Sequence, residues 1–127
     1  MAYLKSYRDL IVWQKSMSLN LMIYKHTTSF PKEEMYGLTS QMRRAAVSVS
    51  ANIAEGQARN STGEFIQFLG IAKGSLAGLE TLIILSRNLE YMSEENSVSL
   101  LSLSAEINKM LYSLQNSLRS PELTTNH

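Results

Sequence analysis

The side chains best suited to catalysis are few in this sequence, and their spacing matches no catalytic motif. Cysteine is absent, and the two histidines, His26 and His127, lie far apart along the chain. The patterns HExxH, CxxC and GxSxG are missing, as are the glycine-rich loops that hold phosphate and the acidic loop that holds calcium. We therefore predict that the protein is not an enzyme, holds no metal or cofactor, and takes no small-molecule substrate.

One carboxylate stands out because of its neighbours. Glu55 lies between Ala54 and Gly56 on a largely apolar stretch, where a buried charge needs a partner. Asn52 precedes it and Arg59 follows it at spacings that share one face of a helix. We predict a structural polar cluster of Asn52 and Glu55 with Arg59 as the ionic partner. A polar pocket around Glu55 is the alternative.

The densest basic spot is Arg43 followed by Arg44. Arginine suits phosphate and carboxylate groups because its planar guanidinium donates parallel hydrogen bonds. Adjacent residues on a helix point about 100° apart, so one of the two faces a partner squarely. Together with Lys15 and Arg59 they are candidate residues for binding nucleic acid or another partner. A salt bridge to an acidic part of the same chain or of another copy explains the pattern equally well.

Charge is distributed unevenly along the chain. The formal net charge is +1, but residues 1–59 carry eight Lys and Arg against four acids, while residues 60–127 carry four against seven. A basic first half fits a nucleic-acid-binding face, because phosphates attract clustered cations. Contacts between oppositely charged parts of two copies, or simply solvated helix faces, explain the same counts.

Length and composition describe one ordinary globular domain. The 127 residues are 44% hydrophobic and 18% charged, which is typical of a single folded domain over 1–127. The absence of cysteine fits a reducing compartment, the polar N-terminus does not resemble a signal peptide, and no uninterrupted run of about 18 apolar residues is present. We expect a cytoplasmic protein with no membrane partner.

Apolar residues recur every three or four positions and predict helices over about 10–28, 39–58, 62–91 and 94–119. Short links make successive helices antiparallel neighbours. We therefore predict an all-α fold, an antiparallel up-down-up-down four-helix bundle, with a loose tail over 122–127. In the first helix the main stripe is Trp13, Met17, Leu21 and Tyr24, with Leu19, Met22 and Ile23 as a surplus outside it.

The third predicted helix carries glycine at every fourth position, at Gly70, Gly74 and Gly78. Each glycine in a helix interior costs about 1 kcal/mol relative to alanine, so the repeat needs a compensating contact. We predict close packing of these glycines, either against the small residues of the second helix or against a neighbouring subunit. Tolerance of the glycines by the helix without any contact is the alternative. The third helix is also apolar on more than one face, and together with the surplus of the first helix this predicts a homo-oligomer.

Five segments carry a family resemblance: residues 9–15 (DLIVWQK), 30–34 (FPKEE), 37–46 (GLTSQMRRAA), 52–56 (NIAEG) and 64–76 (EFIQFLGIAKGSL). Together they resemble the four-helix-bundle proteins encoded in intervening sequences of bacterial 23S rRNA genes, the S23 family. The resemblance implies a ring-like homopentamer without catalytic residues. It also implies kinship with the accessory protein of diversity-generating retroelements, a basic pentamer that partners a reverse transcriptase and nucleic acid. This chain has Ser50 where the family often has proline, and Gly78 where an acid is common.

Two functions fit these observations. The first is a non-enzymatic, self-assembling bundle, pentameric by the family resemblance, that binds RNA or a nucleoprotein through a basic face of its first two helices. The alternative is a protein–protein assembly scaffold that binds no nucleic acid and uses its charge polarity between subunits.

Overall fold

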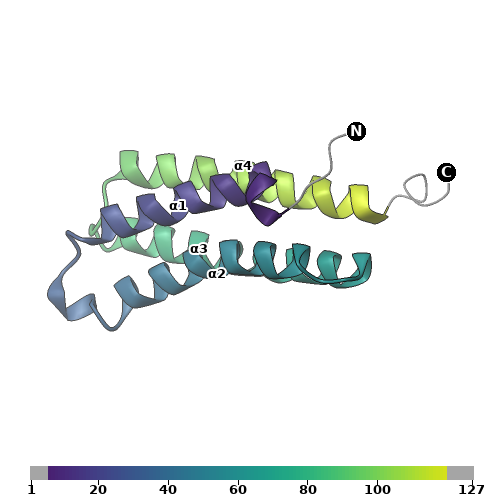
Figure 1. Cartoon of the computed structure of the whole chain (residues 1–127). Helices are drawn as coiled ribbons and strands as arrows, with labels where there is room; N and C mark the ends of the chain where they lie inside the picture. Colours follow the sequence, from purple (N-terminus) through teal and green to yellow (C-terminus); the bar gives the residue numbers. More distant parts are fainter. Residues whose placement is uncertain (1–5, 120–127) are drawn as a thin grey trace.

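The computed structural model describes residues 6–119, and most of them are helical (Figure 1). The elements in chain order are η1 (Tyr7–Asp9), α1 (Ile11–Thr27), η2 (Lys32–Glu34), α2 (Leu38–Gln57), α3 (Thr62–Asn88) and α4 (Glu94–Arg119), where η1 and η2 are single 3₁₀ turns. The predicted all-α four-helix bundle is confirmed. The predicted tail over 122–127 lies outside the described residues.

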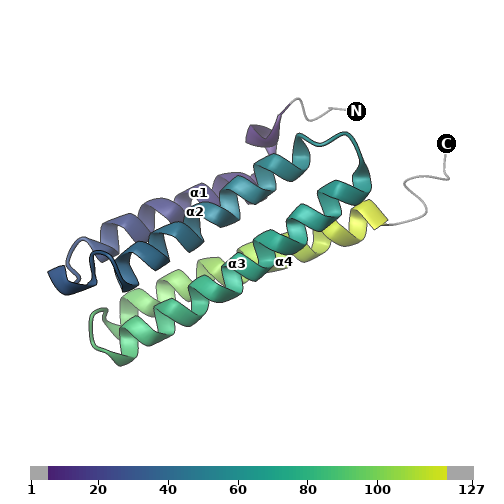
Figure 2. The same ribbon diagram turned by 90° about the horizontal axis from the view of Figure 1, so that it is seen from below.

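The four long helices stand at the corners of a square. α1 packs against α2 and α4, and α3 packs against the same two helices, whereas α1 and α3 make no contact. Successive helices run in opposite directions, and the α1–α2 hairpin lies beside the α3–α4 hairpin (Figure 2). α1 and α3 therefore occupy opposite corners, and each exposes an outer side that the other cannot cover.

The inward side of α1 differs from the predicted stripe. Leu19 and Ile23 are buried in the core, whereas Leu21 is 72% exposed and Met17 and Tyr24 are also exposed. α1 carries two adjacent apolar stripes, and the surplus residues form the inner one. The interpretation of Leu19 and Ile23 as a surplus outside the main stripe was wrong, because apolar spacing defines the rotation of a helix only when one side alone is apolar.

The inward side of α3 is a regular stripe of buried residues, Leu69, Ala72, Leu76, Leu79, Ile83 and Ser86. The five apolar ones belong to one core cluster with buried residues of the other helices, among them Met42, Val49 and Ile53 of α2 and Leu100, Ile107 and Leu111 of α4. The Ser61 hydroxyl accepts the Glu64 N–H at 3.1 Å and caps the start of α3.

α3 ends at Asn88, three residues before the predicted end at residue 91, because the backbone turns at Glu90. The sequence contains no glycine that would indicate this turn. Glu90 has a φ of 64°, in the left-handed region where glycine is usual. The N–H groups of Glu90 and Tyr91 donate to the carbonyls of Arg87 and Ser86, both at 2.9 Å. These bonds satisfy the last carbonyls of the helix and turn the chain toward α4.

Glu34 joins the start of α2 to the end of α3. Its Oε1 accepts the Leu38 N–H at 3.0 Å, where a carboxylate also complements the helix dipole. Its Oε2 accepts the Tyr91 hydroxyl at 3.1 Å. This hydrogen bond, followed by burial and the negative charges of Glu34 and Glu33, raises the pKa of Tyr91 above the ordinary 10.0.

Tyr91→Phe is expected to remove a pH dependence of the free energy of unfolding. Since the pKa of Tyr91 is raised in the folded state, its bond to Glu34 stabilises the fold below pH 10 and is lost as the pH rises through the raised value. Between pH 10 and that raised value, the free energy of unfolding in urea should therefore fall more steeply for the wild type than for Tyr91→Phe. Tyr36→Phe is the control, because Tyr36 is 96% exposed and bonds to no other described residue. Identical pH profiles for Tyr91→Phe and the wild type would contradict this expectation.

Candidate functional site

The four basic residues predicted to bind nucleic acid or a partner do not form one face. Lys15 of α1 lies 3.0 Å from the Glu106 carboxylate of α4, on the α1–α4 side of the bundle. Arg43 of α2 donates from Nε to the Thr27 hydroxyl at 2.9 Å, and its guanidinium lies 4.6 Å from the centre of the Tyr24 ring. Both cations are therefore held by partners within the chain.

Of the other two arginines, Arg44 lies on α2 and Arg59 lies in the link between α2 and α3. Arg59 is 3.1 Å from Glu55 and 4.0 Å from Glu64, and its guanidinium lies over the Phe68 ring at the α2–α3 corner. Arg44 lines a shallow hollow of mixed polar and apolar character between α2 and α3 and has no ion pair with any residue over 6–119. The structure thus disperses the four candidates instead of bringing them together.

The polar cluster predicted around Glu55 also comes apart. Glu55 is exposed and pairs with Arg59, as the helical spacing suggested. Asn52 donates instead to the Ser48 carbonyl at 2.8 Å and to the Ser48 hydroxyl at 3.0 Å. Ser48 in turn bonds to Ser75 of α3 at 2.9 Å. Asn52 therefore supports an α2–α3 contact, and Glu55 occupies no buried pocket.

The predicted glycine stripe does not pack against α2. A Cβ added at Gly74 or Gly78 would meet no atom within 4 Å, and one at Gly70 would meet only Gln115 Nε2 of α4 at 3.4 Å. The close approach of α2 and α3 occurs instead at Gly56, where an added Cβ would lie 2.6 Å from Phe68 Cβ. The stripe misses α2 because it lies on the side of α3 away from the core, so either a neighbouring subunit covers it or the helix tolerates these glycines without a contact.

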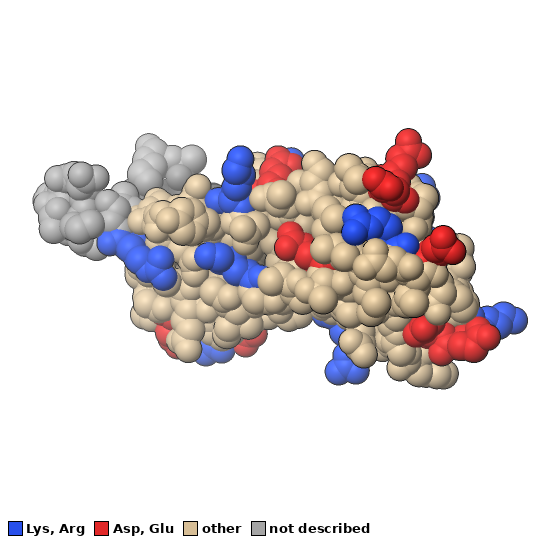
Figure 3. Space-filling view, turned by 180° about the vertical axis from the view of Figure 1, so that it is seen from behind, with Lys and Arg blue, Asp and Glu red and all other residues tan. Residues whose placement is uncertain are grey.

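These glycines belong to a long uncharged surface, which we call the α3 outer face. Its exposed residues are the small Gly70, Gly74, Ala77 and Gly78, the aliphatic Ile71, Ile84 and Leu85, and the polar Gln67 and Thr81. In the view onto α3 and α4, a charge-free band runs along α3 beside a row of charged side chains (Figure 3). No Asp, Glu, Lys or Arg lies on this face over the length of about five helical turns.

The apolar character of α3 is high for a helix with so much exposed surface. Its most apolar window of 18 residues has a mean hydropathy of 1.6, and only 28% of that window is buried. By length and composition alone such a helix is able to cross a membrane. The criterion of an uninterrupted apolar run missed it, because scattered Gly, Ser and Thr break the run without lowering the mean much.

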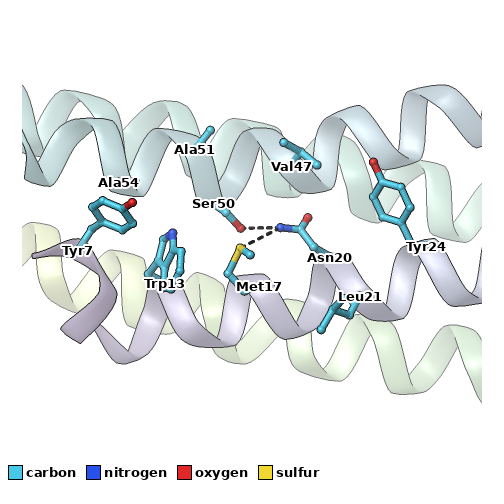
Figure 4. A pocket seen from close by; sticks show the side chains of 10 residues that line it. All are labelled: Tyr7, Trp13, Met17, Asn20, Leu21, Tyr24, Val47, Ser50, Ala51 and Ala54. Carbon is cyan, nitrogen blue, oxygen red and sulfur yellow. Dashed lines mark hydrogen bonds between the residues drawn. The ribbon is translucent and has the colours of Figure 1, made fainter.

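A second uncharged surface is a groove between α1 and α2, with a volume of about 530 Å³ (Figure 4). We call it the α1–α2 groove. Its N-terminal and α1 side consists of Tyr7, Trp13, Met17, Asn20, Leu21 and Tyr24. Its α2 side consists of Val47, Ser50, Ala51 and Ala54. The predicted α1 stripe thus lines a surface groove, a role that apolar spacing alone does not distinguish from a core position.

The floor of the groove holds a buried polar trio of Ser16, Asn20 and Ser50. Ser16 donates to the Trp13 carbonyl at 2.7 Å, so the 2.8 Å bond between the two serines uses the Ser50 proton. Asn20 Nδ2 then donates to Ser50 Oγ at 2.7 Å (Figure 4). Asn20 Oδ1 is buried without a hydrogen-bond partner. Every other polar atom of the trio is thus already bonded within the protein.

The notable features of the described residues are surfaces suited to contact with another molecule, and not clusters of side chains suited to catalysis or metal binding. Over 6–119 no three or more His, Asp and Glu side chains gather where one metal ion could bind them. The two uncharged surfaces, the α3 outer face and the α1–α2 groove, are the features that set this bundle apart from a polar-surfaced one.

Comparisons with known proteins agree on one family. A family model described as 23S rRNA-intervening sequence protein matches residues 8–113. The chain is also similar to a crystal structure from Bacteroides thetaiotaomicron, described as a protein with unknown function from the S23 ribosomal protein family. The sequences are 28% identical, the TM-score is 0.75, and the match covers 87% of this chain and 100% of that chain. No curated protein matches the chain.

Proposed function

The chain belongs to the 23S rRNA-intervening sequence protein family, and from that premise we propose that it is a non-enzymatic helical scaffold that assembles with copies of itself. The observation that carries the proposal is the exposed, uncharged α3 outer face. The family resemblance adds an expected copy number of five. Kinship with the retroelement accessory protein stays a prediction.

The α3 outer face supports assembly because it leaves apolar surface in water. A helix that is apolar all round is normally covered on all sides, yet less than a third of the most apolar part of α3 is buried. Each Å² of apolar surface that a partner covers is worth about 25 cal/mol. The glycines lower the helix propensity of α3, and no close contact within the single chain requires them. Close packing of a second chain against them would offset this loss of helix stability.

The scaffold has better support than a nucleic-acid-binding role. Phosphate backbones are bound by clustered, available cations. Lys15 and Arg59 are engaged with carboxylates, and Arg43 with Thr27 and Tyr24. We therefore place the assembly scaffold first. Low-salt binding of a mixed-sequence RNA that weakens steeply as salt rises would reverse this order.

The wild-type chain is expected to be an oligomer by light scattering, with a mass near five times 14.3 kDa. Since the proposed interface has no charged side chain, the mass should hold as NaCl is raised, whereas an assembly built on ion pairs would dissociate. A monomer at micromolar concentration would overturn the proposal. If that monomer sedimented with phosphatidylcholine vesicles, the α3 outer face would belong to lipid instead.

A further inference from the structure

We infer that the α3 outer face of one copy docks into the α1–α2 groove of a second copy. This inference rests on the proposed self-assembly and specifies its geometry. The contact is heterologous, since each chain presents two different surfaces, a helix face and a groove between two helices.

The chemistry of the two surfaces matches. Neither contains an Asp, Glu, Lys or Arg, although 18% of the chain is charged. Both are dominated by apolar side chains, with Trp13, Met17 and Leu21 in the groove and Ile71, Ile84 and Leu85 on the helix. Joining them would cover both apolar surfaces without burying a charged side chain of either one, and Arg44, in the hollow beside Gly78 and Thr81, would lie at the edge of the contact.

The lengths of the two surfaces are also similar. The α1 side of the groove extends from Trp13 to Tyr24, which is about 17 Å along the helix. The aliphatic residues of the α3 outer face extend from Ile71 to Leu85, about 21 Å at the same rise per residue. Between them Gly74 and Gly78 have no Cβ and no neighbour, so the α3 backbone can approach the groove closely.

Covering the groove removes little water from polar groups. Its two buried polar residues, Asn20 and Ser50, already bond to each other, and Asn20 Oδ1 is shielded from solvent in the single chain. The usual penalty for desolvating polar atoms at an interface is therefore small here. The groove behaves as an apolar surface despite the amide beneath it.

The positions of the two surfaces favour contact between different patches over self-pairing of one patch. α1 and α3 stand at opposite corners of the square, so one chain can present its groove to one neighbour and its α3 outer face to another (Figures 1 and 2). Pairing α3 with α3 across a two-fold axis would leave the groove exposed. Heterologous contacts cover both surfaces and close into a ring when the rotation allows it.

A complementation experiment tests the inference. Ala77→Glu places a charge on the α3 outer face and Ala51→Glu places one in the groove; both alanines are exposed, so the bundle itself should be unchanged. Ala105→Glu is the matched control, at an exposed alanine of α4 outside both surfaces. Far-ultraviolet circular dichroism confirms that each variant is folded, and light scattering measures its mass.

Each of Ala77→Glu and Ala51→Glu is expected to be monomeric alone, and their equimolar mixture should form a dimer of one chain of each, because one intact groove then meets one intact α3 face. Ala105→Glu should keep the wild-type mass. Two outcomes would contradict the inference while leaving self-assembly intact. If Ala51→Glu stays assembled while Ala77→Glu does not, α3 pairs with itself. If both variants are monomeric but their mixture forms no dimer, the two surfaces do not bind each other. A monomeric wild type would instead overturn the proposed function.

Discussion

Gly56→Ala is expected to lower the free energy of unfolding by about 1–3 kcal/mol, the usual penalty for forcing extra volume into a packed interior. The added Cβ would lie 2.6 Å from Phe68 Cβ, closer than real side chains approach, and in tight contact with Phe65 Cδ1 at 3.1 Å. Phe68 Cβ is fixed to the α3 backbone, so no rotamer change relieves the clash. The two helices would have to separate at the point where the α2–α3 link holds them together.

The control is the same substitution at Gly63, where an added Cβ meets nothing within 4 Å. There the free energy of unfolding should stay the same or rise by up to about 1 kcal/mol, because alanine favours the helix. Both variants are best unfolded by urea in the Ala77→Glu background, so that self-assembly does not add to the measured stability. Equal effects at the two glycines would contradict the close approach at Gly56.

The glycines show how far sequence reasoning reaches in this fold. Their spacing correctly placed Gly70, Gly74 and Gly78 on one side of one helix, because that follows from the helical period. It did not reveal which neighbour, if any, covers that side. The role of Gly56 depends on Phe65 and Phe68 across the hairpin, a tertiary contact that α2 alone does not encode.

Helix number, order and approximate bounds were predictable because each helix has strong apolar periodicity and the links between helices are short. The rotation of α1 was not, since its two apolar stripes compete and packing against α2 and α4 decides between them. α2 is continuous through Ser50, the position where the family often has proline, and the Ser50 hydroxyl bonds to α1 instead. The residue type alone gave no sign of that inter-helix bond.

The candidate site was the least predictable part. Basic residues close in sequence, such as Arg43 and Arg44, point toward different helix neighbours, and ion pairs such as Lys15 with Glu106 form between segments far apart along the chain. The α3 outer face and the α1–α2 groove are recognised by the absence of charged side chains. That pattern is visible in the sequence only once the inward side of each helix is known.

Ser50→Ala is expected to lower the free energy of unfolding by about 1–3 kcal/mol, since it leaves the buried donor Asn20 Nδ2 without its main acceptor. The Ser50 hydroxyl accepts from Asn20 Nδ2 and bonds to Ser16. Without it, Nδ2 keeps only a weak 3.6 Å contact with Met17 Sδ, and Asn20 Oδ1 is already unpaired. An entire amide would then be buried between α1 and α2 with almost no hydrogen bonding.

Asn20→Leu separates this cause from a simple loss of packing. It removes the amide together with its unpaired oxygen, while the Ser50 hydroxyl keeps its bond to Ser16, so the free energy of unfolding should change by less than about 1 kcal/mol. The double variant Asn20→Leu/Ser50→Ala should then be more stable than Ser50→Ala alone, a non-additivity expected only of residues in contact. Urea unfolding in the Ala77→Glu background measures all three. Additive losses would mean that Ser50 stabilises the bundle by its volume, and that the amide beneath the groove is not held through that hydroxyl.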